Sequence, residues 1–273
     1  LVMGADKPTT DAFKAAISSA FKMRDLGSAK SFLGMDIVRD RPRMTISISS
    51  QRHVSQMLER FAMGNAKPAK TPLPVKSVLT PCTDDNRRLP VHYPYRALVG
   101  SLLYVSTWTR PDIAFAVSQV ARFQEKPGFE HWAAAKQVLR YLKGTMHVGL
   151  SYSAHRANGS LEGVPLTPTK LLGFVDASWG EDLLTRKSQS GHVFVFGCSA
   201  ISWGTKLQPT VALSSTEAEY LALSTATKEA LFLRNLFAEL WPEHVTTVRL
   251  FEDNQSTIKV ALNLQSSART KHI

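Results

Sequence analysis

Cysteines are scarce in this chain and long apolar runs are absent from it. Cys82 and Cys198 are the two cysteines among 273 residues, which is too few for a disulfide framework or a cysteine-based zinc site. No segment approaches the ~20 consecutive apolar residues of a transmembrane helix, and the N-terminus carries no signal-peptide pattern. We therefore expect an intracellular protein of a reducing compartment, without a membrane partner.

Acidic residues are outnumbered by basic ones, and only in the first half of the chain. The whole chain holds 33 Lys and Arg against 22 Asp and Glu, a formal net charge of +11. Residues 1–150 hold 22 basic and 11 acidic side chains, whereas residues 151–273 hold 11 of each. An excess of positive charge attracts a polyanion such as nucleic acid, and a solvated basic surface is the alternative.

The hydrophobic periodicity divides the chain into two domains and a linker. Residues 1–152 contain mainly amphipathic helices beside one strand pair, and residues 153–169 have the Gly, Ser, Pro and polar composition of a linker. Residues 170–273 begin with three strands and continue with a long helix, a fourth strand and a short helix. This order predicts a layered α/β (α+β) second domain. The expected strands lie at 32–38, 44–50, 171–177, 191–197, 200–205 and 247–252. A first helix is expected after a cap at Thr10 and Asp11, and the other expected helices lie at 51–61, 95–108, 113–124, 129–143, 214–240 and 254–262.

Three acidic residues of the second domain occupy positions where an unpaired carboxylate is costly. Asp176 ends a mostly apolar strand and Asp253 follows another, and a carboxylate buried there needs a partner or a metal. On the long helix, Glu219 shares its face with apolar side chains only. Glu217 instead fits a capping box that begins at Ser214, where its carboxylate satisfies a backbone amide. Glu219 is therefore the candidate ligand of this helix.

If Asp176, Glu219 and Asp253 converge, they create a site for hard divalent cations such as Mg²⁺, which prefer oxygen ligands. Two such ions about 4 Å apart activate water and stabilise the leaving oxygen in phosphodiester cleavage. Acids at strand ends and on helices are more often ordinary surface groups. Their spacing alone leaves both interpretations open.

Motifs along nearly the whole chain carry a family resemblance. The second domain contains VDASWG at 175–180, RKSQSG at 186–191, AISWGTKLQPTVALSSTEAEYLAL at 200–223, EDNQSTI at 252–258 and RTKHI at 269–273. The first domain contains MRDLGSAKSFLGMDI at 23–37, YRALVGSLLYVSTWTRPDIAFAV at 95–117 and HWAAAKQVLRYLKGT at 131–145. In this order they resemble the Pol polyprotein of copia-like LTR retrotransposons. The first domain resembles the end of the reverse transcriptase palm with the thumb and connection region, and the second resembles the ribonuclease H domain.

The resemblance implies a ribonuclease H-like mixed sheet with helices, in which Asp176, Glu219 and Asp253 match the metal-binding acids of the family. It also implies Mg²⁺ or Mn²⁺ as cofactor, an RNA–DNA hybrid as substrate, and the remainder of the Pol polyprotein as a partner. The fourth acid of the family would follow Ile273, and the YVDD aspartates of the polymerase would precede Leu1, so we expect both outside this chain. Proteins of this family are expected in cytoplasmic virus-like particles or in the nucleus.

Two sets of charged residues in the first domain admit both a structural and a functional interpretation. Lys136, Arg140 and Lys143 form one basic stripe of a helix, which suits the phosphate backbone of a hybrid, and a solvated helix face is the alternative. Arg110 and Asp112 flank a proline at a helix start, where Asp112 suits the helix dipole. For this second pair we expect a structural role.

The sequence thus predicts part of a retrotransposon reverse transcriptase, an RNA-directed DNA polymerase, joined to a ribonuclease H. Its second domain would hydrolyse the RNA strand of an RNA–DNA hybrid by two-metal catalysis. A catalytically inactive remnant that only binds nucleic acid or another chain is the alternative. Sequence beyond both ends, with YVDD upstream and an acid downstream, would favour the enzyme.

Overall fold

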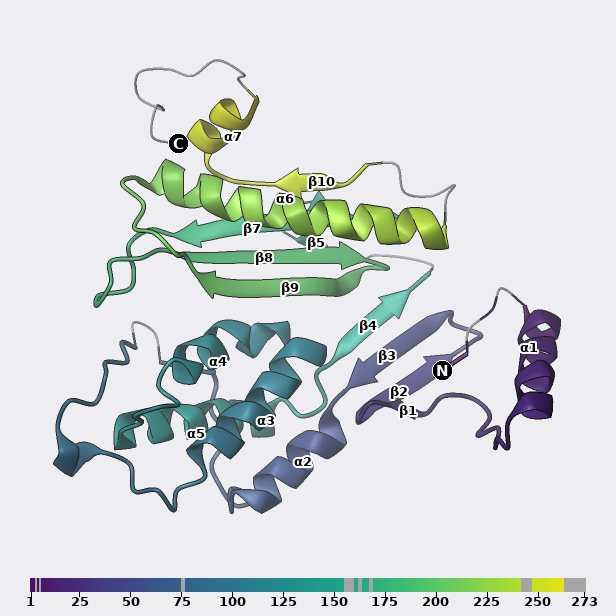
Figure 1. Ribbon diagram of the computed structural model, residues 1–273, viewed down its shortest axis with the longest axis horizontal. Coiled ribbons are helices and arrows are strands. Elements are labelled where there is room, and N and C mark those ends of the chain that lie inside the picture. Colours follow the sequence, from purple (N-terminus) through teal and green to yellow (C-terminus); the bar gives the residue numbers. More distant parts are fainter. Residues whose placement is uncertain are drawn as a thin grey trace.

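The computed structural model describes residues 1–2, 4, 6–74, 77–154, 160–161, 164–166, 169–241 and 247–262. Figure 1 shows a lower unit formed by the first half of the chain and an upper unit formed by the second half. Within these ranges each unit has its own four-stranded sheet, and helices accompany both sheets. The predicted α+β class is confirmed. None of the helices in these ranges has the length and apolar character needed to cross a membrane.

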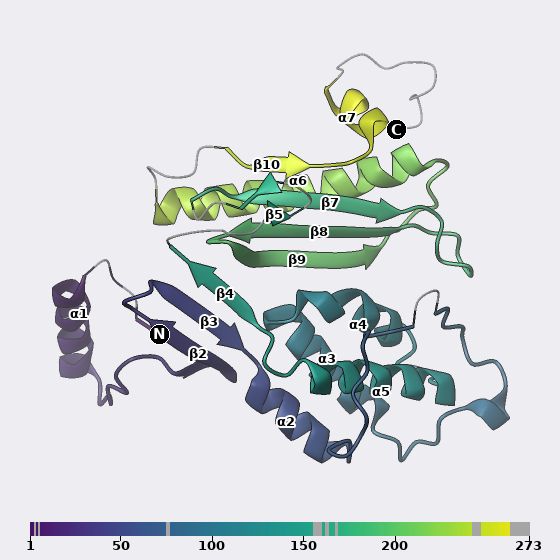
Figure 2. The same cartoon turned by 180° about the vertical axis from the view of Figure 1, so that it is seen from behind.

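An antiparallel sheet forms one end of the first unit. Its order is β1-β2-β3-β4, and β4, which comes from the end of this part of the chain, pairs with β3. The predicted strand pair is confirmed, because β2 and β3 pair continuously from Asp36↔Ser49 to Asp40↔Thr45. The N-terminal helix α1 has no buried residue and lies apart from the other helices, as Figures 1 and 2 both show. These elements are α1 (Lys7–Ala20), β1 (Ser31–Phe32), β2 (Met35–Asp40), β3 (Thr45–Ser49) and β4 (Leu150–Ser153).

Four helices enclose the core of the first unit. Each buries apolar side chains at helical spacing, for example Leu98, Leu102 and Val105 of α3, as an amphipathic pattern requires. The prediction at 113–124 was too long, because the chain first forms a 3₁₀ turn at Pro111–Ile113 and the helix ends at Ala121. The helices are α2 (Gln51–Arg60), α3 (Tyr95–Trp108), α4 (Ala114–Ala121) and α5 (Phe129–Gly144), and a further 3₁₀ turn spans Asp85–Arg87.

Arg110 joins the start of α4 to the end of α5. Its guanidinium is 2% exposed and pairs with Asp112 through Nε–Oδ1 (2.9 Å) and Nη2–Oδ2 (2.7 Å). It also donates to the carbonyl (2.9 Å) and the hydroxyl (2.6 Å) of Thr145, and Tyr141 donates to Asp112 (2.7 Å). Burial raises the pKa of Asp112, but the hydrogen bonds from Arg110 and Tyr141 outweigh burial and hold this pKa below its ordinary value. The predicted structural role is confirmed.

The sheet of the second unit has the order β10-β7-β8-β9. Its first three strands in the chain are antiparallel neighbours, and β10 runs parallel to β7 at the edge, so the implied mixed sheet is present. Helix α6 covers one face, where Val175 and Phe194 of the sheet pack against Ala222, Ala226 and Leu233. The elements are β7 (Leu172–Ser178), β8 (Gln189–Phe196), β9 (Ser199–Leu207), α6 (Ser215–Leu240), β10 (Arg249–Phe251) and α7 (Gln255–Leu262).

The two units touch along β9 and the loop before β8. Trp203 of β9 donates from Nε1 to the Ser106 carbonyl of α3 at 2.7 Å, and Arg122 after α4 forms an ion pair with Asp182. Burial acts to raise the pKa of Asp182, but hydrogen bonds from Arg122 and Thr185 lower it to about 2. The contact between the units therefore contains a charged hydrogen bond that is largely shielded from solvent.

The predicted linker at 153–169 is described only in part. The strands β5 (Ser160–Leu161) and β6 (Val164–Pro165) pair with each other, whereas residues 155–159, 162–163 and 167–168 lie outside the described residues. The division into domains at 1–152 and 170–273 therefore stays a prediction.

Candidate metal centre

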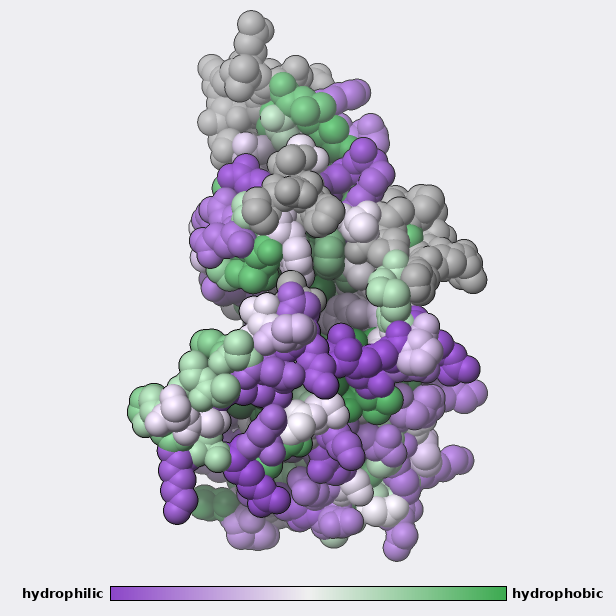
Figure 3. Space-filling model, turned by 90° about the vertical axis from the view of Figure 1, so that its right-hand side faces the viewer, coloured by the Kyte–Doolittle hydropathy of each residue, from purple (hydrophilic) through white to green (hydrophobic). Residues whose placement is uncertain are grey.

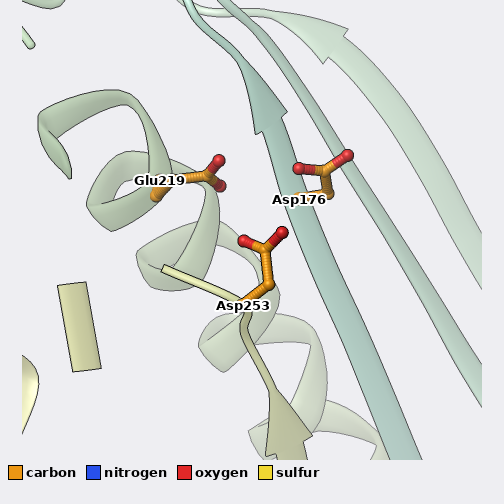
Figure 4. Close-up of side chains that lie close together, drawn as sticks. All are labelled: Asp176, Glu219 and Asp253. Atoms are coloured by element: carbon orange, nitrogen blue, oxygen red, sulfur yellow. The ribbon is translucent and has the colours of Figure 1, made fainter. Parts of the chain in front are cut away.

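The candidate site lies where the parallel pairing of β10 and β7 ends. The register runs from Arg249↔Leu172 to Phe251↔Phe174, and continuing it by two residues places Asp253 beside Asp176. Both acids therefore stand at the carboxyl ends of parallel strands, which lie at the same edge of the sheet. Figure 4 shows Asp176, Asp253 and Glu219 of α6 pointing toward one another.

Helix α6 brings Glu219 to this edge, whereas Glu217 caps the N-terminus of the helix. Ser214 accepts a hydrogen bond from the Glu217 amide at 3.1 Å, and the Glu217 carboxylate accepts one from the Leu213 amide at 2.6 Å. Glu217 therefore serves the helix N-terminus, through the amide one residue before the one that a standard capping box uses. Glu219, two residues later, lies on the face that packs against the sheet and is 6% exposed.

The three carboxylates are close enough to share a cation. One oxygen from each of Asp176, Glu219 and Asp253 lies within 4.8 Å of the other two. Burial, followed by the charges of Glu252, Asp176 and Asp253, raises the pKa of Glu219 to about 8, although the Ala177 amide donates to it. Without a cation, the site therefore holds Glu219 in its protonated form at neutral pH.

Glu252 is a fourth acid at this edge that sequence reasoning did not identify. Burial is the main cause that raises its pKa, Asp253 and Asp176 add to it, and the Asn254 amide acts in the opposite direction. One oxygen of Glu252 accepts from that amide at 3.1 Å, and the other is buried without a hydrogen-bond partner among the described residues. The sequence feature that could have identified Glu252 is its position next to Asp253, directly after an apolar strand.

The donor set fits a hard divalent cation. Mg²⁺ and Mn²⁺ prefer carboxylate oxygens, and three carboxylates from separate elements meet here. The Oε2 atom of Glu219 is buried and has no hydrogen-bond partner in the described part of the chain. Buried polar atoms are nearly always paired in native proteins, so this oxygen is suited to a ligand that comes from outside the chain.

We expect the stability of the metal-free chain to fall as pH rises from about 5 to 8. The pKa of Glu219 is about 8 in the folded chain against 4.5 as the reference value, so in this window the folded state binds more protons than the unfolded state. Glu219→Gln removes this pH-dependent contribution to stability, and above pH 8 the variant should be more stable than the wild type by about 1–3 kcal/mol. Urea unfolding in a chelator, measured across pH, tests this.

Glu217→Gln is the control for this experiment and should keep the wild-type pH dependence. The slope that persists in Glu219→Gln should combine the contribution of Glu252, whose pKa is raised for the same main reason, with that of histidines whose pKa values burial lowers. The contribution of these histidines has the opposite sign, and they are His53, His131 and His192. If the wild type and Glu219→Gln showed the same dependence of stability on pH, the raised pKa of Glu219 would be contradicted.

The basic stripe of α5 lies on the first unit, and the structure uses two of its residues internally. Arg140 donates from Nε to the Lys67 carbonyl at 2.7 Å, and Lys143 donates to the carbonyls of Gly64 (2.6 Å) and Ala66 (2.8 Å). Lys136 lies over the ring of Trp132, 5.7 Å from its centroid. These contacts give Arg140 and Lys143 a structural role different from the solvated face named as the alternative, because they hold residues 64–67 against α5. Binding of nucleic acid by the stripe stays a prediction.

Comparison with known proteins identifies the family of this chain. Residues 1–75 match the family model "Reverse transcriptase (RNA-dependent DNA polymerase)". The Pol polyprotein of transposon TNT 1-94 from Nicotiana tabacum is 41% identical over the whole chain, and that of transposon RE2 from Arabidopsis thaliana is 31% identical over the whole chain. The uncharacterized mitochondrial protein AtMg00810 of A. thaliana is 35% identical over 84% of this chain and 88% of its own length. No solved structure matches.

These matches identify the chain as part of a retrotransposon polyprotein, whose first 75 residues match a reverse transcriptase. The chain belongs to the Pol polyprotein family of copia-type retrotransposons, as its motifs predict. It spans 20% of the length of the tobacco Pol polyprotein and 18% of that of RE2.

Proposed function

We propose that the second unit is a ribonuclease H that hydrolyses the RNA strand of an RNA–DNA hybrid, within a Pol polyprotein that copies RNA into DNA. The observation that carries the proposal is the convergence of Asp176, Glu219 and Asp253 from three separate elements. Membership of the Pol family supports it, because copying RNA into DNA produces a hybrid whose RNA strand must be removed before the second DNA strand is made.

Asp176, Glu219 and Asp253 would hold the divalent cation, Mg²⁺ or Mn²⁺. When bound, such a cation lowers the pKa of a water molecule and stabilises the oxygen that leaves phosphorus. The chain itself contributes position: β7 and the segment after β10 hold the two aspartates, and the Ala177 amide orients Glu219. Glu219 must lose its proton to bind the cation, so binding should strengthen as pH rises toward 8.

The first unit would attract the hybrid through its charge. All of the excess positive charge of the chain lies in residues 1–150, and such charge binds phosphates without reading sequence. Figure 3, whose colours show hydropathy and not charge, shows hydrophilic residues over much of the lower unit beside a paler and green area at its left. In this proposal the first unit binds the polyanion and the second unit cleaves it.

We expect cleavage of the RNA strand in an RNA–DNA hybrid, and none of DNA duplex, when Mg²⁺ or Mn²⁺ is present. A chelator should abolish cleavage and added cation should restore it. The assay uses the 273-residue chain and a form extended past Ile273 to the acid that the family resemblance places there. The extended form should be faster, because a fourth carboxylate strengthens cation binding.

The non-catalytic alternative gives a different result in the same assay. A remnant would bind the hybrid, with affinity that falls steeply with salt, yet neither form would cleave it in either cation. Binding without cleavage by the extended form would therefore contradict the proposed ribonuclease.

A further inference from the structure

A cleft of about 200 Å³ lies beside Asp176, on the sheet face opposite α6. Ser178, Gln189 and Thr205 contribute its walls from β7, β8 and β9. Its floor includes Gly191, which pairs with Asp176 across the two strands. A Cβ added at Gly191 would meet nothing closer than the Asp176 carbonyl at 3.9 Å. The sheet therefore leaves space directly next to the candidate metal centre.

The remaining wall of the cleft comes from the other unit. Phe115 of α4 lines it and is 45% exposed, whereas Ala116 and Val117 next to it are buried in the core of the first unit. The core therefore does not need the Phe115 ring. The hydrogen bond from Trp203 to Ser106 and the ion pair of Arg122 with Asp182 hold α4 against this part of the second unit.

Besides the acidic side chains of Asp176 and Glu181, the polar groups of the cleft are neutral hydrogen-bonding groups. The Ser178 hydroxyl is buried and has no partner among the described residues. Gln189 donates from Nε2 to the Thr205 hydroxyl at 2.8 Å, so Thr205 keeps its own hydrogen for another acceptor. The Thr205 hydroxyl beside an aromatic ring suits a nucleoside, whose sugar hydroxyl donates and accepts and whose base has an apolar face. A ribose offers the 2′-hydroxyl that a deoxyribose lacks.

We infer that Phe115 contacts a nucleotide of the RNA strand next to the cleavage site, so that the first unit completes the substrate site of the second. This inference rests on the proposed ribonuclease activity. The ring of Phe115 packs on the base or sugar, and the Thr205 hydroxyl hydrogen-bonds to the ribose. Phe115 positions the strand beside Asp176 and takes no part in proton transfer.

The test compares steady-state cleavage of a hybrid by the extended chain and its variants. Phe115→Ala should raise KM about tenfold, in line with the loss of one aromatic stack, and should leave kcat within about threefold. Phe115→Trp keeps an aromatic face and should retain a KM close to that of the wild type. The matched control is Phe129→Ala, because Phe129 has nearly the same exposure (47%) and lies outside the cleft.

A second measurement does not depend on rates. A hybrid with 4-thiouridine in its RNA strand should crosslink on irradiation to the peptide that contains Phe115, as located by mass spectrometry. Unchanged KM in Phe115→Ala, or equal effects of the Phe115 and Phe129 changes, would overturn the role of Phe115 and leave the ribonuclease intact. A wild type that fails to cleave would instead refute the ribonuclease, and this inference with it.

Discussion

Glu219→Gln should abolish cleavage of the RNA–DNA hybrid, whereas Glu217→Gln should leave it nearly unchanged. Glu219 is buried beside the exposed carboxylates of Asp176 and Asp253, and an uncharged amide at its position weakens cation binding. Metal ligands contribute several kcal/mol to such reactions, so the rate should fall by at least about 10³-fold. Glu217 accepts from the Leu213 amide, and Gln retains an acceptor for this bond.

The two variants form a matched pair, since they make the same change two residues apart on one helix. Initial rates with the extended chain give the comparison, and circular dichroism shows that both variants are folded. Binding of Mn²⁺, followed by calorimetry, should be lost in Glu219→Gln alone. If Glu217→Gln inactivates the enzyme and Glu219→Gln does not, the assignment of the helix ligand is wrong.

Arg110→Ala should lower the free energy of unfolding by about 2–3 kcal/mol, because it removes a buried guanidinium and leaves the Thr145 carbonyl without its donor, whereas Asp112 is itself exposed to solvent. The guanidinium is almost fully buried and makes four hydrogen bonds, to Asp112 and Thr145. Its removal leaves the Asp112 carboxylate with only the Tyr141 hydroxyl as a side-chain donor among the described residues. It also frees the end of α5 from the start of α4.

Arg52→Ala is the control for this change, because Arg52 pairs with Asp36 at the surface of the same unit. Exposed pairs contribute little, so its cost should stay below about 1 kcal/mol. Urea unfolding measures both variants. In the double variant Arg110→Ala/Asp112→Ala the loss should be smaller than the sum of the two single losses, since the charges act as a pair. Equal costs for Arg110→Ala and Arg52→Ala would contradict the structural role of Arg110.

Local features were predictable from the sequence because their causes are local. The periodicity of apolar residues located α3 at 95–108 and α6 within one residue of its ends. The capping signal at Ser214 separated Glu217 from Glu219, and the structure places Glu217 at the helix N-terminus. The end of α4 was predicted three residues too late, at 124 instead of Ala121, since helix ends are the least certain part of such a pattern.

The contacts of charged residues were less predictable, because the sequence does not show which group each charged side chain will contact. Arg140 and Lys143 fall on one helical stripe, yet they donate to backbone carbonyls more than 70 residues away in the chain. In the sequence Glu252 is one of two adjacent acids, and only the fold shows that one of its carboxylate oxygens is buried beside the site. Long-range packing decides which charges face solvent.

By itself, the sequence determined the helices and most strands, the three candidate acids and the family, because each depends on residue type and short spacing. The tertiary structure alone decided how the units meet. It brought the carboxylates of Asp176, Glu219 and Asp253 within 4.8 Å of one another, and it placed Phe115 of one unit across a cleft from Asp176 of the other. Such contacts join segments tens of residues apart in the chain, and no local pattern of residues encodes which of these segments will touch.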